Sequence, residues 1–538
     1  MKEINKIKQK SLQDYFISKL GTSQWIRVFE TSPNSQELDI AILSSLVPSN
    51  KVNELLSTYE WDIDQGFGRP SISIRYPEGN VQYSRFGDKK GIEPLVIKQS
   101  FFGIKEPDLN ISEEFRLFHN LFWNDGEKVY QAISDCGDTE DIVRFIDHSI
   151  EIKLKSLKQF CAFKNMSLAI YFDVFYFSEY DLNELKLKPD SIEKKGADYF
   201  FSIYWTEYNI THNNFKSLSR FLGKKFIQPM PIEKTGIWPF ESIKQYEDFI
   251  IGIDGNGVEK KYTCNPESLT ISYSSNKDEV SYLQPIFFTK EVLKKYYDFP
   301  EKFVVQDGFL SCGNLWQLQI DNNHEKYIIV YLGDLGKLPE NEQKYWKSYN
   351  ISPDGRISQV AFKRDFKAEF TEPIATDLIF KKVYKKTNRM WKQSFGWQFF
   401  LPLSIKDDFH FSSIHIPLSP SQKEFDEQIL SLTKILIDSI NESEIDKSVT
   451  IKEIQSGSIR KLETYLAELN YPDPKNHIDF LINLQSLRST GIAHRKGKNY
   501  TKPWKYFGLN EKDTKTVFIE ILQKANLFLE YLQNLCKI

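Results

Sequence analysis

The sequence predicts a multidomain fold, with an α+β amino-terminal region followed by an all-α carboxy-terminal helical bundle. Up to about residue 400, short alternating segments and turn residues predict strands and hairpins. From Ser421 onward, apolar residues recur at helical spacing with little strand signal. A chain of 538 residues is also too long for a single hydrophobic core. We therefore expect several domains, of which the last is helical.

The amino-terminal region contains two hairpin signals. Ser71–Arg75 alternates polar and apolar residues, a Pro-Glu-Gly-Asn turn follows, and 81–85 alternates again. The second hairpin is centred on Asp254-Gly255-Asn256-Gly257. Further predicted elements are a helix over 112–131, strands at 142–153 and 168–177 with a short helix over 155–163 between them, and a buried strand at 327–332.

Four helices are predicted near the carboxyl end. They cover 422–440, 458–469, a stretch from 475 or 476 through Leu487, and a last helix capped by Asp513 with an apolar stripe behind it. Pro402, Pro417 and Pro420 mark the boundary before them. We therefore predict an α+β module at 1–405, with a split near 280 if it forms two subdomains, a linker at 406–420, and a helical domain at 421–538.

Charge and composition limit the classes of function. The net charge is only −3, so attraction to nucleic acid must come from local patches. One basic block runs from 378 to 405 and includes Trp391 and Trp397, which suits stacking on bases if the block is not simply a solvated face beside buried aromatics. Five scattered cysteines show no metal-ligand spacing, and no apolar run is long enough to span a bilayer. We expect a cytoplasmic protein without a cofactor, a metal or a membrane partner.

The second basic block carries the strongest functional signal. Arg488 and His494 lie six positions apart, and no acidic residue occurs from 488 to 505. Histidine can transfer protons near neutral pH, and arginine can hold two phosphate oxygens without losing its charge. On an ideal helix the two side chains would lie roughly 120° from eclipsed, so they converge only if Gly491 bends the backbone or a second chain completes the site. The plainer alternative is a helix-end arginine beside a turn histidine.

A carboxy-terminal helical domain with Leu487-Arg488 at a helix end, and five residues between Arg488 and His494, resembles the HEPN superfamily. The likeness covers about residues 421–538. It implies a metal-independent endoribonuclease of HEPN type, in which two helical domains dimerise and the Arg and His of both chains line one cleft. Many members act in bacterial antiviral defence or toxin systems, and the likeness implies an RNA substrate and a homodimer. A sensor or regulatory role for the amino-terminal module is inferred from the architecture alone.

The resemblance leaves activity open at one position. Ser489 stands where active members often carry Asn, Asp or His, and some members bind RNA or nucleotides without cutting. A catalytically silent RNA- or nucleotide-binding protein is therefore the first alternative. Local positive charge, rather than the family pattern, marks the expected RNA-binding residues, which are Arg495, Lys496, Lys498, Tyr500 and Lys502.

A second alternative is a metal-dependent nuclease of the PD-(D/E)xK type. Asp173 lies on a predicted strand, and Glu184-Leu185-Lys186 follows eleven residues later. Two carboxylates could hold a divalent ion while the lysine activates water. The segment around Glu184 reads as a loop or short helix rather than the adjacent strand that this chemistry requires. His410 and His415, in turn, are expected on a strand before the helical domain.

Overall fold

The structure is a computed structural model that describes residues 2–31, 37–63, 71–75, 77, 79–84, 91–208, 214–271, 279–404, 406–449, 457–491 and 501–537. The chain divides into two compact units. Unit 1 comprises Met1–Ser134 and Asp138–Ile243, and unit 2 comprises Asp135–Gly137 and Lys244–Ile538. Each unit is described by itself.

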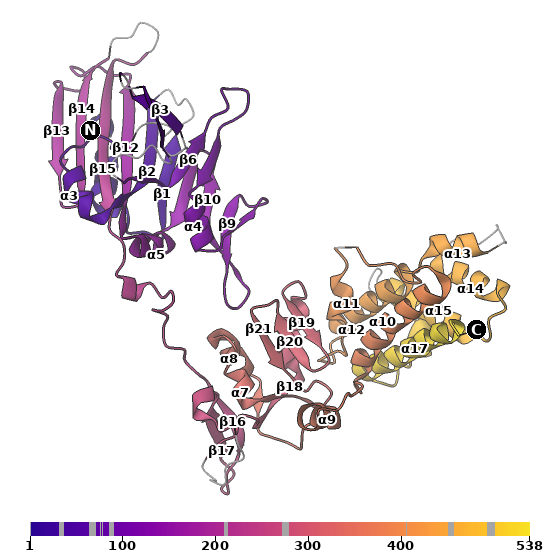
Figure 1. Cartoon of the computed structure of the whole chain (residues 1–538). Helices are drawn as coiled ribbons and strands as arrows, with labels where there is room; N and C mark the ends of the chain where they lie inside the picture. Colours follow the sequence, from indigo (N-terminus) through magenta and orange to yellow (C-terminus); the bar gives the residue numbers. More distant parts are fainter. Residues whose placement is uncertain are drawn as a thin grey trace. The chain divides into compact units, whose positions relative to one another are not determined.

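Unit 1 is built on a large antiparallel sheet with the strand order β13-β14-β15-β12-β2-β1-β11-β10-β9-β8, and β5 pairs with β2 beside this path (Figure 1). The long strands β2, β12 and β15 lie side by side, and their apolar residues give the sheet its core. The strands are β1 (Trp25–Thr31), β2 (Leu38–Pro48), β5 (Glu93–Pro94), β8 (Phe122–Asn124), β9 (Val129–Ile133), β10 (Thr139–Ile146), β11 (Ser149–Lys153), β12 (Met166–Ser178), β13 (Asp190–Lys195), β14 (Tyr199–Glu207) and β15 (Ser217–Ile227).

An amino-terminal helical segment packs on this sheet through aromatic side chains. Phe16 is fully buried and meets Phe172 and Phe221 edge to face, with ring centroids 5.0 and 5.2 Å apart. Such aromatic contacts bury a large apolar area and fix the orientation of the helix. The helical elements of unit 1 are α1 (Lys2–Ile7), α2 (Lys10–Asp14), the π-helical η1 (Tyr15–Lys19), η2 (Ser49–Lys51), α3 (Val52–Leu55), α4 (Glu113–Phe118), α5 (Leu154–Lys164) and η3 (Ile232–Lys234).

Several predicted elements of unit 1 are confirmed, and one is wrong. The hairpin β3 (Ser71–Arg75) and β4 (Asn80–Ser84) forms as predicted, and α5 lies between β11 and β12. The helix predicted over 112–131 ends at Phe118, because Asn120 adopts a left-handed conformation with φ of 49° and the chain then enters β8. A second small hairpin joins β6 (Val96–Gln99) to β7 (Asp108–Ile111).

The first part of unit 2 contains small antiparallel sheets around a buried aromatic core. The predicted hairpin at 254–257 is confirmed by β16 and β17, and the predicted strand at 327–332 by β22. Trp346 is fully buried in this core, and its indole meets Phe288 edge to face. The elements are β16 (Asp248–Ile253), β17 (Glu259–Thr263), η4 (Pro266–Ser268), β18 (Pro285–Thr289), η5 (Lys290–Leu293), α6 (Lys294–Asp298), β19 (Phe303–Gln306), β20 (Phe309–Cys312), β21 (Trp316–Gln319), β22 (Tyr327–Tyr331), α7 (Leu332–Leu335), α8 (Glu340–Lys347), β23 (Asn350–Ile351) and α9 (Gln359–Lys367).

The rest of unit 2 is helical. The predicted helices at 422–440, 458–469 and 475–487 are confirmed, and Asp513 caps the last helix by accepting a hydrogen bond from the Thr516 amide at 3.0 Å. The helices are α10 (Thr376–Phe395), α11 (Phe409–Ser413), α12 (Gln422–Thr433) with its π-helical extension η6 (Lys434–Asp438), α13 (Glu442–Ser448), α14 (Ser458–Glu468), α15 (Lys475–Gly491), α16 (Thr501–Tyr506) and α17 (Thr514–Leu535).

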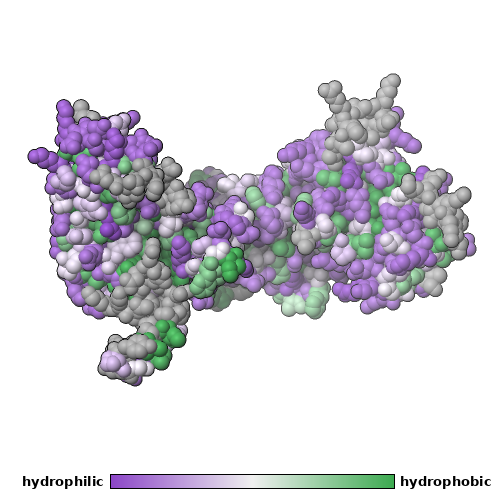
Figure 2. Space-filling model, turned by 90° about the horizontal axis from the view of Figure 1, so that it is seen from above, coloured by the Kyte–Doolittle hydropathy of each residue, from purple (hydrophilic) through white to green (hydrophobic). Residues whose placement is uncertain are grey.

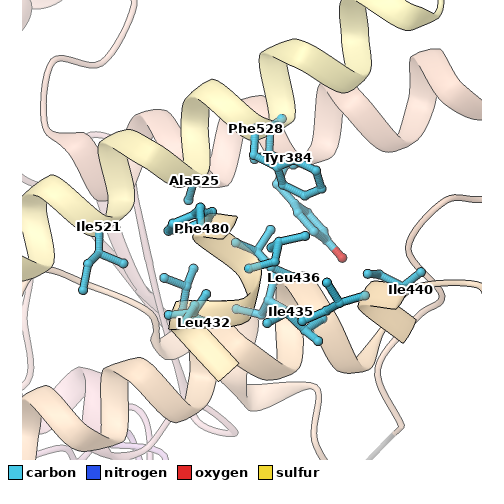
Figure 3. Packing of buried hydrophobic residues seen from close by; sticks show 14 of the residues in the cluster. Tyr384, Leu432, Ile435, Leu436, Ile440, Phe480, Ile521, Ala525 and Phe528 are labelled. Atoms are coloured by element: carbon cyan, nitrogen blue, oxygen red, sulfur yellow. The ribbon is translucent and has the colours of Figure 1, made fainter. Parts of the chain in front are cut away.

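This helical region begins at α10, upstream of the boundary predicted at 406–420. Helix α10 packs along α17, and Figure 3 shows Tyr384 of α10 beside Phe528 of α17 in a core shared with Leu436 and Phe480. Trp391 of α10 is fully buried in the same core. The lysine-rich sequence from 378 to 395 therefore belongs to an amphipathic helix of the bundle, with Tyr384 and Trp391 on its buried face.

No helix in the described part of the chain is both long and apolar enough to cross a membrane. In the view of Figure 2, hydrophilic residues dominate the surface and hydrophobic residues form separate spots among them.

Candidate functional site

Arg488 lies in the last turn of α15, the helix predicted to deliver it. Leu487 beside it is buried in the bundle core, and this anchors the helix end. The Arg488 side chain remains 31% exposed and forms an ion pair with Asp438. Its Nη1 donates to both carboxylate oxygens of Asp438, at 2.9 and 3.2 Å. Nε and Nη2 have no hydrogen-bond partner among the described residues, so one edge of the guanidinium is available to a phosphate.

Asp438 and Lys434 lie on the π-helical segment η6, which continues α12. The two side chains are one turn apart on η6, and the residues between them are buried in the core. The Lys434 ammonium is hydrogen-bonded to Asp407. Short π-helical segments often occur at functional sites. We call Arg488, Asp438, Lys434, Asp407 and His410 the Arg488 cluster.

His410 is the described histidine of this cluster. It belongs to the short helix α11, which corrects the prediction of a strand there. Its Nδ1 lies 2.9 Å from the Ser431 hydroxyl, and its Nε2 lies 3.8 Å from Asp407. Burial lowers the pKa of His410, and the charges of Lys434 and Arg488 lower it further against the influence of Asp407. His410 is therefore a buried hydrogen-bonding group rather than an exposed acid.

Sequence reasoning missed this cluster because its members are far apart in the chain. Arg488 and Asp438 are separated by 50 positions. No periodic pattern links an aspartate in the predicted 422–440 helix to an arginine at the end of another helix, so the pairing becomes evident only once α12, η6 and α15 are packed together.

The other predicted residues at this end of the chain fall largely outside the structure's description. His494, Arg495, Lys496, Lys498 and Tyr500 lie at 492–500, outside the described residues. Lys502 is described, and it is exposed on α16, which contacts α15. The structure thus brings Lys502 and Arg488 onto neighbouring helices.

The earlier basic block at 378–405 is not a surface for base stacking. The indole of Trp391 is buried, and Trp397 packs against it with ring centroids 5.5 Å apart. Lys381 donates to the Ser412 carbonyl at 2.8 Å, and burial lowers its pKa to about 8. Of the two interpretations left open by the sequence, the structure favours a helix face beside buried aromatics.

The alternative metal site is occupied by other interactions. Both oxygens of Asp173 accept hydrogen bonds from Arg220, each at 2.7 Å. Glu184 accepts from the Asp181 amide at 2.9 Å and lies 3.4 Å from Lys216, while Lys186 follows in the same turn with φ of 53°. Across the described ranges, no group of three or more His, Cys, Asp and Glu side chains is placed to hold a metal ion.

The fold and these sites define an α+β protein with a helical carboxy-terminal region, and comparison with known proteins adds no family. No family model matches the chain, and neither a curated protein nor a solved structure matches it significantly.

Proposed function

We propose that the carboxy-terminal helical domain is a metal-independent endoribonuclease of HEPN type. In this proposal Arg488 binds the scissile phosphate and stabilises its developing charge, and His494 transfers the protons. The observation that carries it is the Arg488 guanidinium, which Asp438 holds at a helix end and whose Nε and Nη2 have no hydrogen-bond partner among the described residues. An arginine in this state can make two parallel hydrogen bonds to a phosphate.

The surrounding charges support an RNA ligand. Lys502 is exposed on α16 next to α15, and the sequence continues the basic character through 495–498. Lysines near a phosphate-binding arginine raise the local concentration of a polyanion. We infer that two copies of the chain pair through the helical domain and share a cleft. The amino-terminal module would restrain the nuclease until it senses a trigger, as in defence or toxin-like systems.

The experiment that tests this function compares wild type with His494→Ala on RNA and DNA, with and without EDTA. His148→Ala is the matched control, because His148 is exposed in the turn between β10 and β11. We expect RNA cleavage that survives EDTA, is lost in His494→Ala and is kept in His148→Ala. Cleavage that requires a divalent metal would contradict the proposal. Salt-sensitive RNA binding without cleavage would favour the catalytically silent RNA-binding protein.

A further inference from the structure

A cavity of about 370 Å³ lies within unit 2, and its lining includes no residue of the Arg488 cluster. Its walls come from η5, from the 322–328 loop, from the first turn of α10, from 415–418 and from the start of α17. This volume is in the range of small-molecule sites, which begins at roughly 300 Å³. We call it the Lys290 cavity.

One side of the Lys290 cavity is apolar and rigid. The ring of Tyr297 is stacked on the His415 imidazole, with centroids 3.9 Å apart and planes 4° from parallel. Glu424 holds this imidazole from the other side, 3.3 Å from its Nε2. The aliphatic residues of the lining are Leu293, Ile328, Ile374, Leu378, Leu418 and Ile519. A flat or apolar group therefore finds a preformed wall here.

The polar lining offers donors that have no partner. Lys290 and Lys515 make no ion pair or hydrogen bond among the described residues, and burial lowers the pKa of Lys290. The Tyr297 hydroxyl likewise has no hydrogen-bond partner there, although only 8% of this residue is exposed. The Nδ1 of His324 accepts from the amides of Lys326 and Tyr327, so in the neutral imidazole the proton is on Nε2.

The charges of Asp377 and Glu325 act on Lys290, but neither acid forms an ion pair or hydrogen bond with these donors among the described residues. Both oxygens of Asp377 accept backbone hydrogen bonds, from Leu378 at 3.0 Å and Ile416 at 3.2 Å. Glu325 is exposed and makes no ion pair with a described residue. These donors line the cavity without an acceptor among the described residues, so a ligand in the cavity can supply the acceptors.

We propose that the Lys290 cavity binds a small phosphate monoester with a flat or apolar body. Lys290 and Lys515 neutralise the phosphate dianion, the Tyr297 hydroxyl and the His324 Nε2–H donate to its oxygens, and the aliphatic wall receives the body. A phosphate has three terminal oxygens, which matches several converging donors better than a carboxylate does. This assignment does not depend on the ribonuclease proposal, because it shares no residue with the Arg488 cluster.

Direct binding to the full-length protein tests this inference, with AMP, glucose 6-phosphate, inorganic phosphate and adenosine as probes in calorimetry. We expect AMP to bind at least about tenfold more tightly than adenosine, which lacks the charge, and than glucose 6-phosphate, whose body is polar. Inorganic phosphate should compete with AMP. Equal binding of AMP and adenosine, or no binding of AMP at millimolar concentration, would overturn the proposal.

Variants assign the binding to this cavity. Lys290→Met should weaken AMP binding at least about tenfold, and Tyr297→Phe, which keeps the stacked ring, should weaken it by a smaller factor. Lys294→Met is the matched control, because Lys294 is exposed and paired with Asp298 at the surface. A ligand-binding lysine is distinguished from a structural one by denaturation, since Lys290→Met should shift the midpoint upward. Unchanged AMP affinity in Lys290→Met would contradict the assignment.

Discussion

Two arginine–aspartate pairs in this protein show how the same residues serve different purposes. Arg220 and Asp173 lie diagonally across the neighbouring strands β15 and β12, and two guanidinium nitrogens meet two carboxylate oxygens at 2.7 Å each. Arg488 and Asp438 come from α15 and η6, and within the described ranges Nη1 is the guanidinium nitrogen that is engaged. The first pair satisfies both partners. The second positions an arginine and leaves part of it open to a ligand.

The largest expected effect on stability comes from breaking the ion pair between Arg220 and Asp173. Arg220→Met leaves the largely buried Asp173 carboxylate without its partner, so the free energy of unfolding should fall by about 2 kcal/mol. Arg488→Met removes an exposed pair and should cost less than about 1 kcal/mol. Urea denaturation of both variants measures the difference. Equal losses in the free energy of unfolding would mean that the two ion pairs contribute equally to stability.

The next effect is a gain in stability. Lys290 is partly buried and makes no ion pair with a described residue, so Lys290→Met should raise the free energy of unfolding by roughly 1 kcal/mol. Lys290 would then resemble Arg488, because both side chains would serve to bind a ligand. A loss of stability would show that Lys290 supports the fold instead.

Glu424, the acid that contacts His415 in the wall of the Lys290 cavity, should make the free energy of unfolding depend on pH. Burial acts to raise the pKa of Glu424, but hydrogen bonds from His415, Ser419 and the 418 and 419 amides lower it to about 2. Because the folded pKa is depressed, this group stabilises the fold above its unfolded pKa near 4.5, and the contribution is lost as pH falls toward 2. Glu424→Gln should therefore reduce the acid sensitivity of unfolding between these values. An unchanged pH profile would contradict the hydrogen-bonding account.

The smallest expected effect is a change in RNA affinity when the ion pair between Arg488 and Asp438 is weakened. Asp438→Asn keeps the shape of the side chain but removes its charge, so Arg488 should be freer to bind RNA. RNA affinity at low salt should rise by a factor of about 2 to 5, and the difference should shrink as salt increases. A filter-binding series over salt concentration measures it. Weaker binding would mean that Asp438 is needed to orient Arg488.

Local signals in the sequence predicted much of the fold. The hairpin at 254–257 and the cap at Asp513 depend on turn and capping residues that act within a few positions, and both are confirmed. The helix over 112–131 was wrong because Leu121 and Tyr130 pack on the sheet, a contact that helical periodicity cannot reveal. The boundary of the helical region was placed too late because charged residues concealed the buried face of α10.

The candidate sites were predictable only in part. Arg488 stood out through its position at a helix end, and the structure places it there. Its partner Asp438, the buried His410 and the unpaired Lys290 follow from tertiary packing between distant segments. No residue near Lys290 in the sequence indicates a cavity, because the first turn of α10 and the start of α17 supply its other walls.

The proposed role of Arg488 in metal-independent RNA cleavage is tested most directly by measuring cleavage in EDTA by wild type, Arg488→Met and Arg460→Met. Arg460 is the matched control, because it is exposed on α14 and paired with Glu463. We expect Arg488→Met to remain folded and to lower kcat/KM at least about a hundredfold. We expect Arg460→Met to cleave RNA like wild type. RNA cleavage by a folded Arg488→Met protein at the wild-type rate would contradict the proposed role of Arg488.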